Sequence, residues 1–195
     1  TQAIRRRDRW ADWAVIVLVA VALVLGLALR ETVRSRTVPF AFPEAPVSGR
    51  CPANWVRETG DDPLLRARDP LGGEFRTTIE LRSRPLAAGA EPAIVLDALA
   101  LERAGQVAAY RMLGTDQVLL GGQNATRRTL ATRRTFTCVH VDSNPYVDRL
   151  PVVVRGVDLA LREGDRVVVV TLLADANRFD ANYRYLRRFI QALEL

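Results

Sequence analysis

A run of seventeen residues without a charge, from Trp13 to Leu29, most strongly limits what the start of this chain can form. As a helix it is roughly 25 Å long at about 1.5 Å per residue, and the preceding turn with Trp10 brings it to the ~30 Å of a bilayer core. Trp10 and Trp13 fit the aromatic belt at a membrane interface. The sequence therefore predicts one transmembrane helix at about residues 10–30 within a membrane anchor of residues 1–36.

A cleaved signal peptide and a buried core helix are the alternatives for this apolar run. The run is longer than the roughly 7–15 residues of a signal-peptide core, which favours an anchor that is retained. A retained anchor places the rest of the chain at the lipid bilayer.

The positive charge is concentrated in the anchor. All 28 basic residues are arginines, and the chain has a formal net charge of +6. Residues 1–36 contain seven arginines and three acidic residues, so residues 37–195 carry only +2. Because nucleic-acid binding needs several phosphates neutralised at once, this near-neutral region argues against a nucleic-acid partner.

Charge and cysteines together predict the orientation of the anchor. Four arginines precede the apolar run and three follow it, a small excess in favour of a cytoplasmic N-terminus. The only cysteines, Cys51 and Cys138, follow the run, and a disulfide between them would stabilise the fold by about 4–5 kcal/mol. Such a bond persists in an oxidising compartment, which predicts an extracytoplasmic domain at the cytoplasmic membrane. Two unrelated buried thiols are the alternative.

Residues 37–50 contain three prolines and neither a helical nor an alternating pattern. This composition predicts an extended, semi-rigid linker. Phe40 and Phe42 stand out in it, because a solvated linker gains nothing from exposed phenylalanine. They contact either the domain that follows or a partner subunit, and the sequence leaves both open.

Residues 51–195 are enough for one domain with its own core. Strict alternation over residues 75–82 predicts a strand with one buried face, and Pro92 and Gly105 bracket a predicted helix. Residues 110–120 look extended.

The valine-rich segments 152–161 and 167–173 lie on either side of Glu163-Gly164-Asp165, which predicts a hairpin. Its second arm is apolar on both faces, as in a central strand covered by helices. Steps of four and three residues then predict an amphipathic helix within residues 177–195, with its apolar face formed by Phe179, Tyr183, Leu186, Ile190 and Leu193.

The sequence ATRRT occurs twice in residues 125–135, at a spacing of six. In a continuous strand an even spacing places Arg128 and Arg134 on one face and Arg127 and Arg133 on the other. Charge divided between two faces makes a poor phosphate groove, so we expect an exposed or edge strand. Contact with lipid headgroups or an acidic partner is the functional alternative.

Several of these segments resemble the PsbP-like family. The resemblance rests on Pro52-Ala-Asn-Trp55, on the hairpin EGDRVVVVTLLA, and on the final helix beginning ANRFDANY. It implies an α+β fold in which an antiparallel sheet is flanked by helices as an α/β/α sandwich. Family members include extrinsic subunits of photosystem II, a nuclear import factor that binds the GTPase Ran, and bacterial lipoproteins, which share a docking surface rather than chemistry.

The sequence offers no set of groups for catalysis. His140 is the only histidine, and a nucleophile needs both a base and an orienting group. No metal-ligand spacing is present, and we expect neither a cofactor nor an enzymatic activity.

The sequence therefore predicts a non-catalytic accessory subunit of a larger membrane complex, with a respiratory or photosynthetic electron-transport complex suggested by the family resemblance. Its partners would be the other subunits of that complex. The alternative is an anchored domain that binds a small apolar or lipid ligand. The candidate partner contacts are Phe40, Phe42, Arg127, Arg128, Arg133 and Arg134.

Overall fold

The computed structural model describes residues 2–43, 45, 47–120, 129–142 and 150–194. The chain forms two compact units. The first comprises residues 1–38 with 52–54, and the second comprises residues 39–51 with 55–195.

The first unit is dominated by helix α1, Gln2–Ser35. Within it, Trp13–Val33 is a segment of 21 residues with a mean hydropathy of 2.5, and none of it is buried. By length and composition this segment can cross a membrane. It ends a few residues later than the predicted span of about 10–30.

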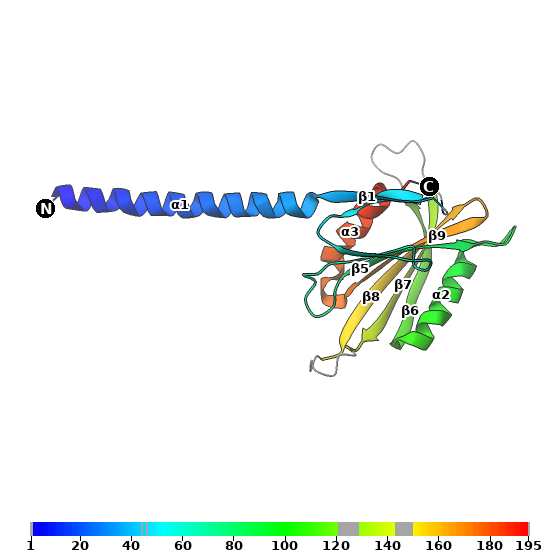
Figure 1. Ribbon diagram of the computed structural model, residues 1–195. Coiled ribbons are helices and arrows are strands. Elements are labelled where there is room, and N and C mark those ends of the chain that lie inside the picture. Colours follow the sequence, from blue (N-terminus) through cyan, green and yellow to red (C-terminus); the bar gives the residue numbers. More distant parts are fainter. Residues whose placement is uncertain (1, 44, 46, 121–128, 143–149, 195) are drawn as a thin grey trace. The chain divides into compact units, whose positions relative to one another are not determined.

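The second unit is built on a seven-stranded sheet in which every neighbouring pair is antiparallel (Figure 1). The predicted antiparallel sheet with flanking helices is confirmed. In spatial order the strands are β3 (Val56–Thr59), β4 (Leu65–Arg68), β5 (Thr78–Pro85), β9 (Arg166–Asp175), β8 (Val152–Glu163), β7 (Thr129–His140) and β6 (Ala108–Leu120).

Strands β8 and β9 form the predicted hairpin. Glu163 pairs with Arg166, which leaves Gly164 and Asp165 as a two-residue loop. Gly164 has a φ of 60°, which a residue without Cβ adopts at little cost. Strand β9 is the central strand of the sheet, as its apolar sequence predicts.

Two helices cover opposite faces of this sheet (Figure 1). Helix α2, Pro92–Gln106, packs its Leu96 and Leu99 against even-numbered residues of β8 and odd-numbered residues of β9. Helix α3, Phe179–Gln191, packs on the other face against residues such as Leu159 and Leu172. The alternation of side chains along each strand makes this division possible.

Helix α3 follows a short 3-10 turn, η1 (Ala176–Arg178). The Asp175 carboxylate accepts a hydrogen bond from the Asn177 backbone amide, so Asp175 caps the turn. The buried residues of α3 are Phe179, Leu186 and Phe189. Trp55 is buried against the ring of Tyr185, with 5.2 Å between centroids.

The segment expected to be a linker contains strands instead. Strands β1 (Thr37–Phe42) and β2 (Val47–Pro52) form a two-stranded sheet. The ring of Phe40 stacks on Phe189 of α3 at 5.5 Å, and the backbones of Ser48 and Glu194 exchange hydrogen bonds of 3.0 and 2.9 Å. Aromatic burial and backbone pairing fix this segment on the domain, which a spacer of prolines alone would not provide.

Candidate docking surface

A buried ion pair lies beneath α2. Arg103 donates hydrogen bonds of 2.5 and 2.9 Å to the two carboxylate oxygens of Asp158 and one of 3.0 Å to the hydroxyl of Thr171. Thr171 in turn donates to Asp158 Oδ1 at 2.6 Å. Asp158 and Thr171 are completely buried, so each polar group in this cluster depends on the others.

The position of Arg103 explains its protonation. Burial lowers the pKa of its guanidinium, but the charge and hydrogen bonds of Asp158 outweigh that effect, so the pKa lies above its ordinary value. The guanidinium therefore stays charged, and the pair acts structurally, because Asp158 is completely buried and Arg103 is only 9% exposed.

The ring of Phe136, a residue of strand β7, packs against the guanidinium of this ion pair. The Arg103 guanidinium carbon lies 4.6 Å from the centre of the Phe136 ring, and the Tyr110 ring lies 5.3 Å from it. The opposing residue on β8 is Gly156, where a Cβ would come within 2.2 Å of the Phe136 ring. The ring therefore occupies the space that any larger residue at position 156 would need.

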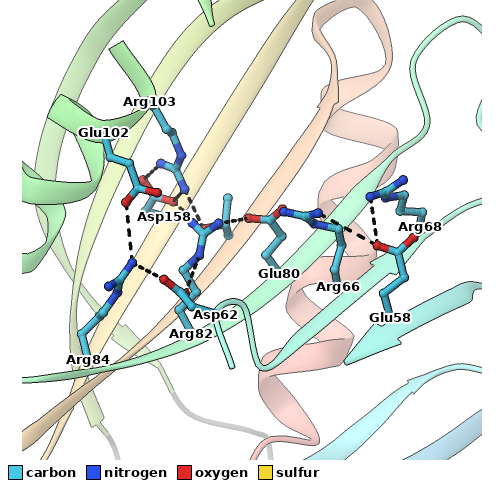
Figure 2. Close-up of polar contacts among 11 residues, drawn as sticks. Glu58, Asp62, Arg66, Arg68, Glu80, Arg82, Arg84, Glu102, Arg103 and Asp158 are labelled. Atoms are coloured by element: carbon cyan, nitrogen blue, oxygen red, sulfur yellow. Dashed lines mark hydrogen bonds and ion pairs between the residues drawn. The ribbon is translucent and has the colours of Figure 1, made fainter. Parts of the chain in front are cut away.

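A row of eight charged residues continues on the same face of the sheet, beside α2 (Figure 2). We call it the charged row. Acidic and basic side chains alternate along it, and most are partly exposed. Strands β3, β4 and β5, the loop before β4 and helix α2 supply its members: Glu58, Asp62, Arg66, Arg68, Glu80, Arg82, Arg84 and Glu102.

Glu80 and Arg82 form the centre of the charged row. Glu80 accepts from Arg66 Nε at 2.7 Å and faces Arg82 Nη2 at 3.0 Å. Arg82 and Arg84 both contact Asp62, and Arg84 Nη2 lies 3.6 Å from Glu102 Oε2. Figure 2 shows how these contacts join the strands to α2.

The charged row contains four acids and four arginines, so its formal charge is balanced. It can present both donors and acceptors to a polar protein surface, but it provides no excess of positive charge for phosphates. Side chains that are already fixed by ion pairs with one another lose little rotamer freedom on binding, which favours specific recognition.

The arginine repeat lies partly outside the described residues, because Arg127 and Arg128 fall in the segment 121–128. Arg133 and Arg134 lie on opposite faces of β7, as the even spacing predicts. Arg133 donates to both oxygens of Asp116, while the buried Arg134 donates to Asp97 and to Thr115. Strand β7 lies between β8 and β6, so it is not an edge strand.

The aromatic candidates lie in two places. Trp10 and Trp13 are part of α1, and the side chain of Trp13 is 65% exposed. Phe40 and Phe42 are partly buried against the α3-side core. Of the two alternatives for these phenylalanines, contact with the domain itself is the one that the structure contains.

The predicted disulfide between Cys51 and Cys138 is not present in the structure. Both side chains are buried, and burial raises the pKa of each thiol. Cys51 packs in the core on the α3 side. Cys138 shares its face of β7 with Phe136 and Arg134, which is the α2 side, so the sheet separates the two sulfurs.

In the described part of the chain, side chains suited to catalysis or metal binding do not cluster. His140 is exposed at the end of β7, and its ring lies edge-on to Phe75 at 5.2 Å. Among the described residues, no three His, Cys, Asp or Glu side chains are grouped as metal ligands.

Sequence reasoning missed both the buried ion pair and the charged row. A signal for the pair is present in the sequence, because Asp158 and Thr171 are polar residues at inward positions of apolar strands. Arg103 follows Leu96 and Leu99 on the inner face of α2. The charged row gives a weaker signal, since arginine and glutamate in short strands look like ordinary surface residues.

Several solved structures are similar to this chain at very low sequence identity. Cyanobacterial PsbP from Synechocystis is 8% identical, with a TM-score of 0.56 over 82% of this chain and 92% of that one. LpqN of Mycobacterium tuberculosis, described as involved in cell envelope biogenesis, is 14% identical, covering 81% and 89% at a TM-score of 0.48. The yeast Ran-binding protein Mog1p is 12% identical, covering 82% and 95% at 0.48.

The chain has a PsbP-like fold. No family model matches the amino-acid sequence, and no curated protein sequence matches it. The predicted PsbP-like resemblance is therefore confirmed for the fold, and identities this low carry no activity from one protein to another.

Proposed function

We propose that this protein is a single-pass accessory subunit of a membrane complex, and that its PsbP-like domain docks on other subunits outside the cytoplasm. The observation that carries the proposal is that one chain combines an apolar helix long enough to span a bilayer with a domain that bears the charged row on one face of its sheet. A respiratory or photosynthetic host complex belongs to this proposal and rests on the resemblance alone.

The charged row supports a docking role. It is partly exposed, crosses three strands, and holds its side chains in defined positions through contacts such as Arg68 Nη2 to Glu58 Oε2 at 3.0 Å. Exposed ion pairs of this kind add little stability by themselves, so their extent is better explained by recognition.

The packing of the α3 side favours docking over binding of an apolar ligand. Phe179, Leu186 and Phe189 are each at most 4% exposed where α3 meets the sheet. A ligand between these layers would need the space that the side chains occupy.

The membrane topology is part of the proposal. Arginines before and after the apolar segment give a small bias toward a cytoplasmic N-terminus. A cysteine placed in the domain by Leu71→Cys, at a side chain that is 82% exposed, should react with a membrane-impermeant maleimide in intact cells. Reaction only after the cells are broken would reverse the orientation.

The docking proposal is tested by affinity purification of the full chain from its native membranes in mild detergent. The test variant is Glu58→Arg, which reverses a half-exposed charge of the row, and the control is Glu74→Arg, the same change at an exposed residue outside it. We expect defined partner subunits with the wild type and the control, and a reduced yield of them with Glu58→Arg. Equal recovery with both variants would remove the charged row from the interface.

A further inference from the structure

The two edges of the seven-stranded sheet differ in their protection. The edge strand β3 has four residues and carries Arg57 and Glu58, which is how proteins commonly discourage pairing of an edge. The opposite edge strand, β6, has thirteen residues without proline. Among the described residues, no strand pairs with its outer side.

Strand β6 also exposes apolar side chains. Met112 is 55% exposed, Leu113 is 50% exposed and Leu119 is 66% exposed. A long edge with exposed apolar residues is a template for another strand, because its outward backbone N–H and C=O groups remain available.

A bulge sets the charge pattern of this edge. Between Met112 and Gly114 the register with β7 shifts by one residue, so Leu113 is extra. Arg111 pairs with Thr137 and Asp116 with Arg133, which places Arg111 and Asp116 on the same face although their separation of five is odd. Arg111 is exposed and makes no ion pair with any described residue.

We propose that two copies of this chain pair antiparallel through β6, with Arg111 of each copy opposite Asp116 of the other. The same register places Met112 opposite Thr115, and the two-fold axis passes between Leu113 and Gly114. Four residues separate Arg111 from Asp116 in each strand, so the two β6 strands have the same spacing between these residues. The bulges at Leu113 then face each other, and the pairing needs no further register shift.

A second copy fits this edge better than an unrelated strand. One strand offers a positive and a negative residue on a single face, so the two-fold operation alone makes the charges complementary. The Asp116 carboxylate already accepts from Arg133, and its lone pairs allow a further donor. At the axis, a Cβ on Gly114 would meet nothing within 4 Å, so this edge is open.

The first test measures association of the full chain in detergent by sedimentation equilibrium. The test variant is Arg111→Glu and the control is Arg76→Glu, the same change at an exposed residue outside β6. We expect a reversible dimer for the wild type and the control. The dissociation constant of Arg111→Glu should rise about ten-fold or more, because one substitution alters two cross-strand pairs.

The second test is chemical cross-linking. In the proposed register the two Leu113 residues are offset by one residue across neighbouring strands, so their Cα atoms lie about 6 Å apart. Leu113→Cys should therefore cross-link between copies with a short bis-maleimide, while Leu71→Cys should not. Cys51 and Cys138 are buried and give a low background.

A monomeric wild type would overturn the proposed pairing. This holds even if β6 is found to pair with a strand of another protein. A dimer equally strong in Arg111→Glu, with no cross-link at position 113, would also overturn it and would point to association through α1. The docking proposal would survive either result, because it depends on the charged row.

Discussion

Replacing Gly156 with alanine should destabilise the domain strongly, because the new methyl group would overlap the ring of Phe136. The Cβ position lies 2.2, 2.5 and 2.7 Å from three carbons of that ring, whereas normal contact begins near 3.4 Å. The ring would have to move by about 1 Å. Phe136 is completely buried, with the Arg103 guanidinium 4.6 Å from its centre, so the movement would disturb the buried ion pair.

Overpacking a well-packed core costs about 1–3 kcal/mol, and we expect the upper end because a charged pair supports the ring. For a domain of this size, roughly 3 kcal/mol lowers the melting temperature by about 6–12 °C. Urea unfolding of the full chain in detergent, followed by circular dichroism, gives the free energy of unfolding. Gly105→Ala is the control, since a Cβ there meets nothing within 4 Å, and it should be neutral or slightly stabilising.

A double-mutant cycle with Phe136→Leu tests the cause. Leucine removes the ring atoms that the methyl group would meet, so the double variant should be more stable than the sum of the single effects by about 1–3 kcal/mol. Additive effects, or a Gly156→Ala variant within about 0.5 kcal/mol of the wild type, would refute the reasoning.

Asp158→Asn leaves a buried guanidinium without its counter-charge and should lower the free energy of unfolding by about 3–5 kcal/mol, measured in urea; a loss below ~1 kcal/mol would contradict the buried pair. The hydrogen bonds from Arg133 lower the pKa of Asp116, so its contribution to stability is present above the ordinary pKa and is lost as the pH falls through the lowered one. NMR titration of the Asp116 carboxyl group should show the lowered pKa in the wild type and a return toward the ordinary pKa in Arg133→Gln. The same titration midpoint in both proteins would count against the contact. Cys51 and Cys138 should both react with a thiol reagent after unfolding without reductant and resist it in the folded protein, whereas no reactive thiol after unfolding would indicate a disulfide.

The larger elements of the fold could be predicted because their patterns are long. Helix α2 is marked by Pro92, and the hairpin of β8 and β9 is marked by Gly164 between apolar runs. Helix α3 follows from its 3.6-residue period. Each of these signals is local, so one sequence is sufficient to find it.

The shorter strands were not predicted because tertiary contacts stabilise them. Strands β3 and β4 have four residues each, and the charged Arg57 and Glu58 are adjacent in β3 while β4 alternates arginine with leucine and alanine. Strands β1 and β2 contain prolines and a glycine that favour a linker on local grounds, and they form through aromatic contacts such as that of Phe40. Packing against α3 overrides the local preference.

The candidate contacts show the same division. The even spacing of the arginine repeat correctly places Arg133 and Arg134 on opposite faces of β7. Their partners could not be predicted, because Asp116 and Asp97 come from β6 and α2, far away in the sequence. The expected disulfide failed for a related reason, since spacing alone does not reveal which face of the sheet each cysteine occupies.

The most direct test of an anchored docking subunit is native gel electrophoresis of the full chain from its own membranes, after washing with alkaline carbonate and mild solubilisation. The account predicts that the chain stays in the membrane fraction and migrates in an assembly larger than its own dimer. Release into the carbonate wash, or migration only as monomer and dimer, would contradict it.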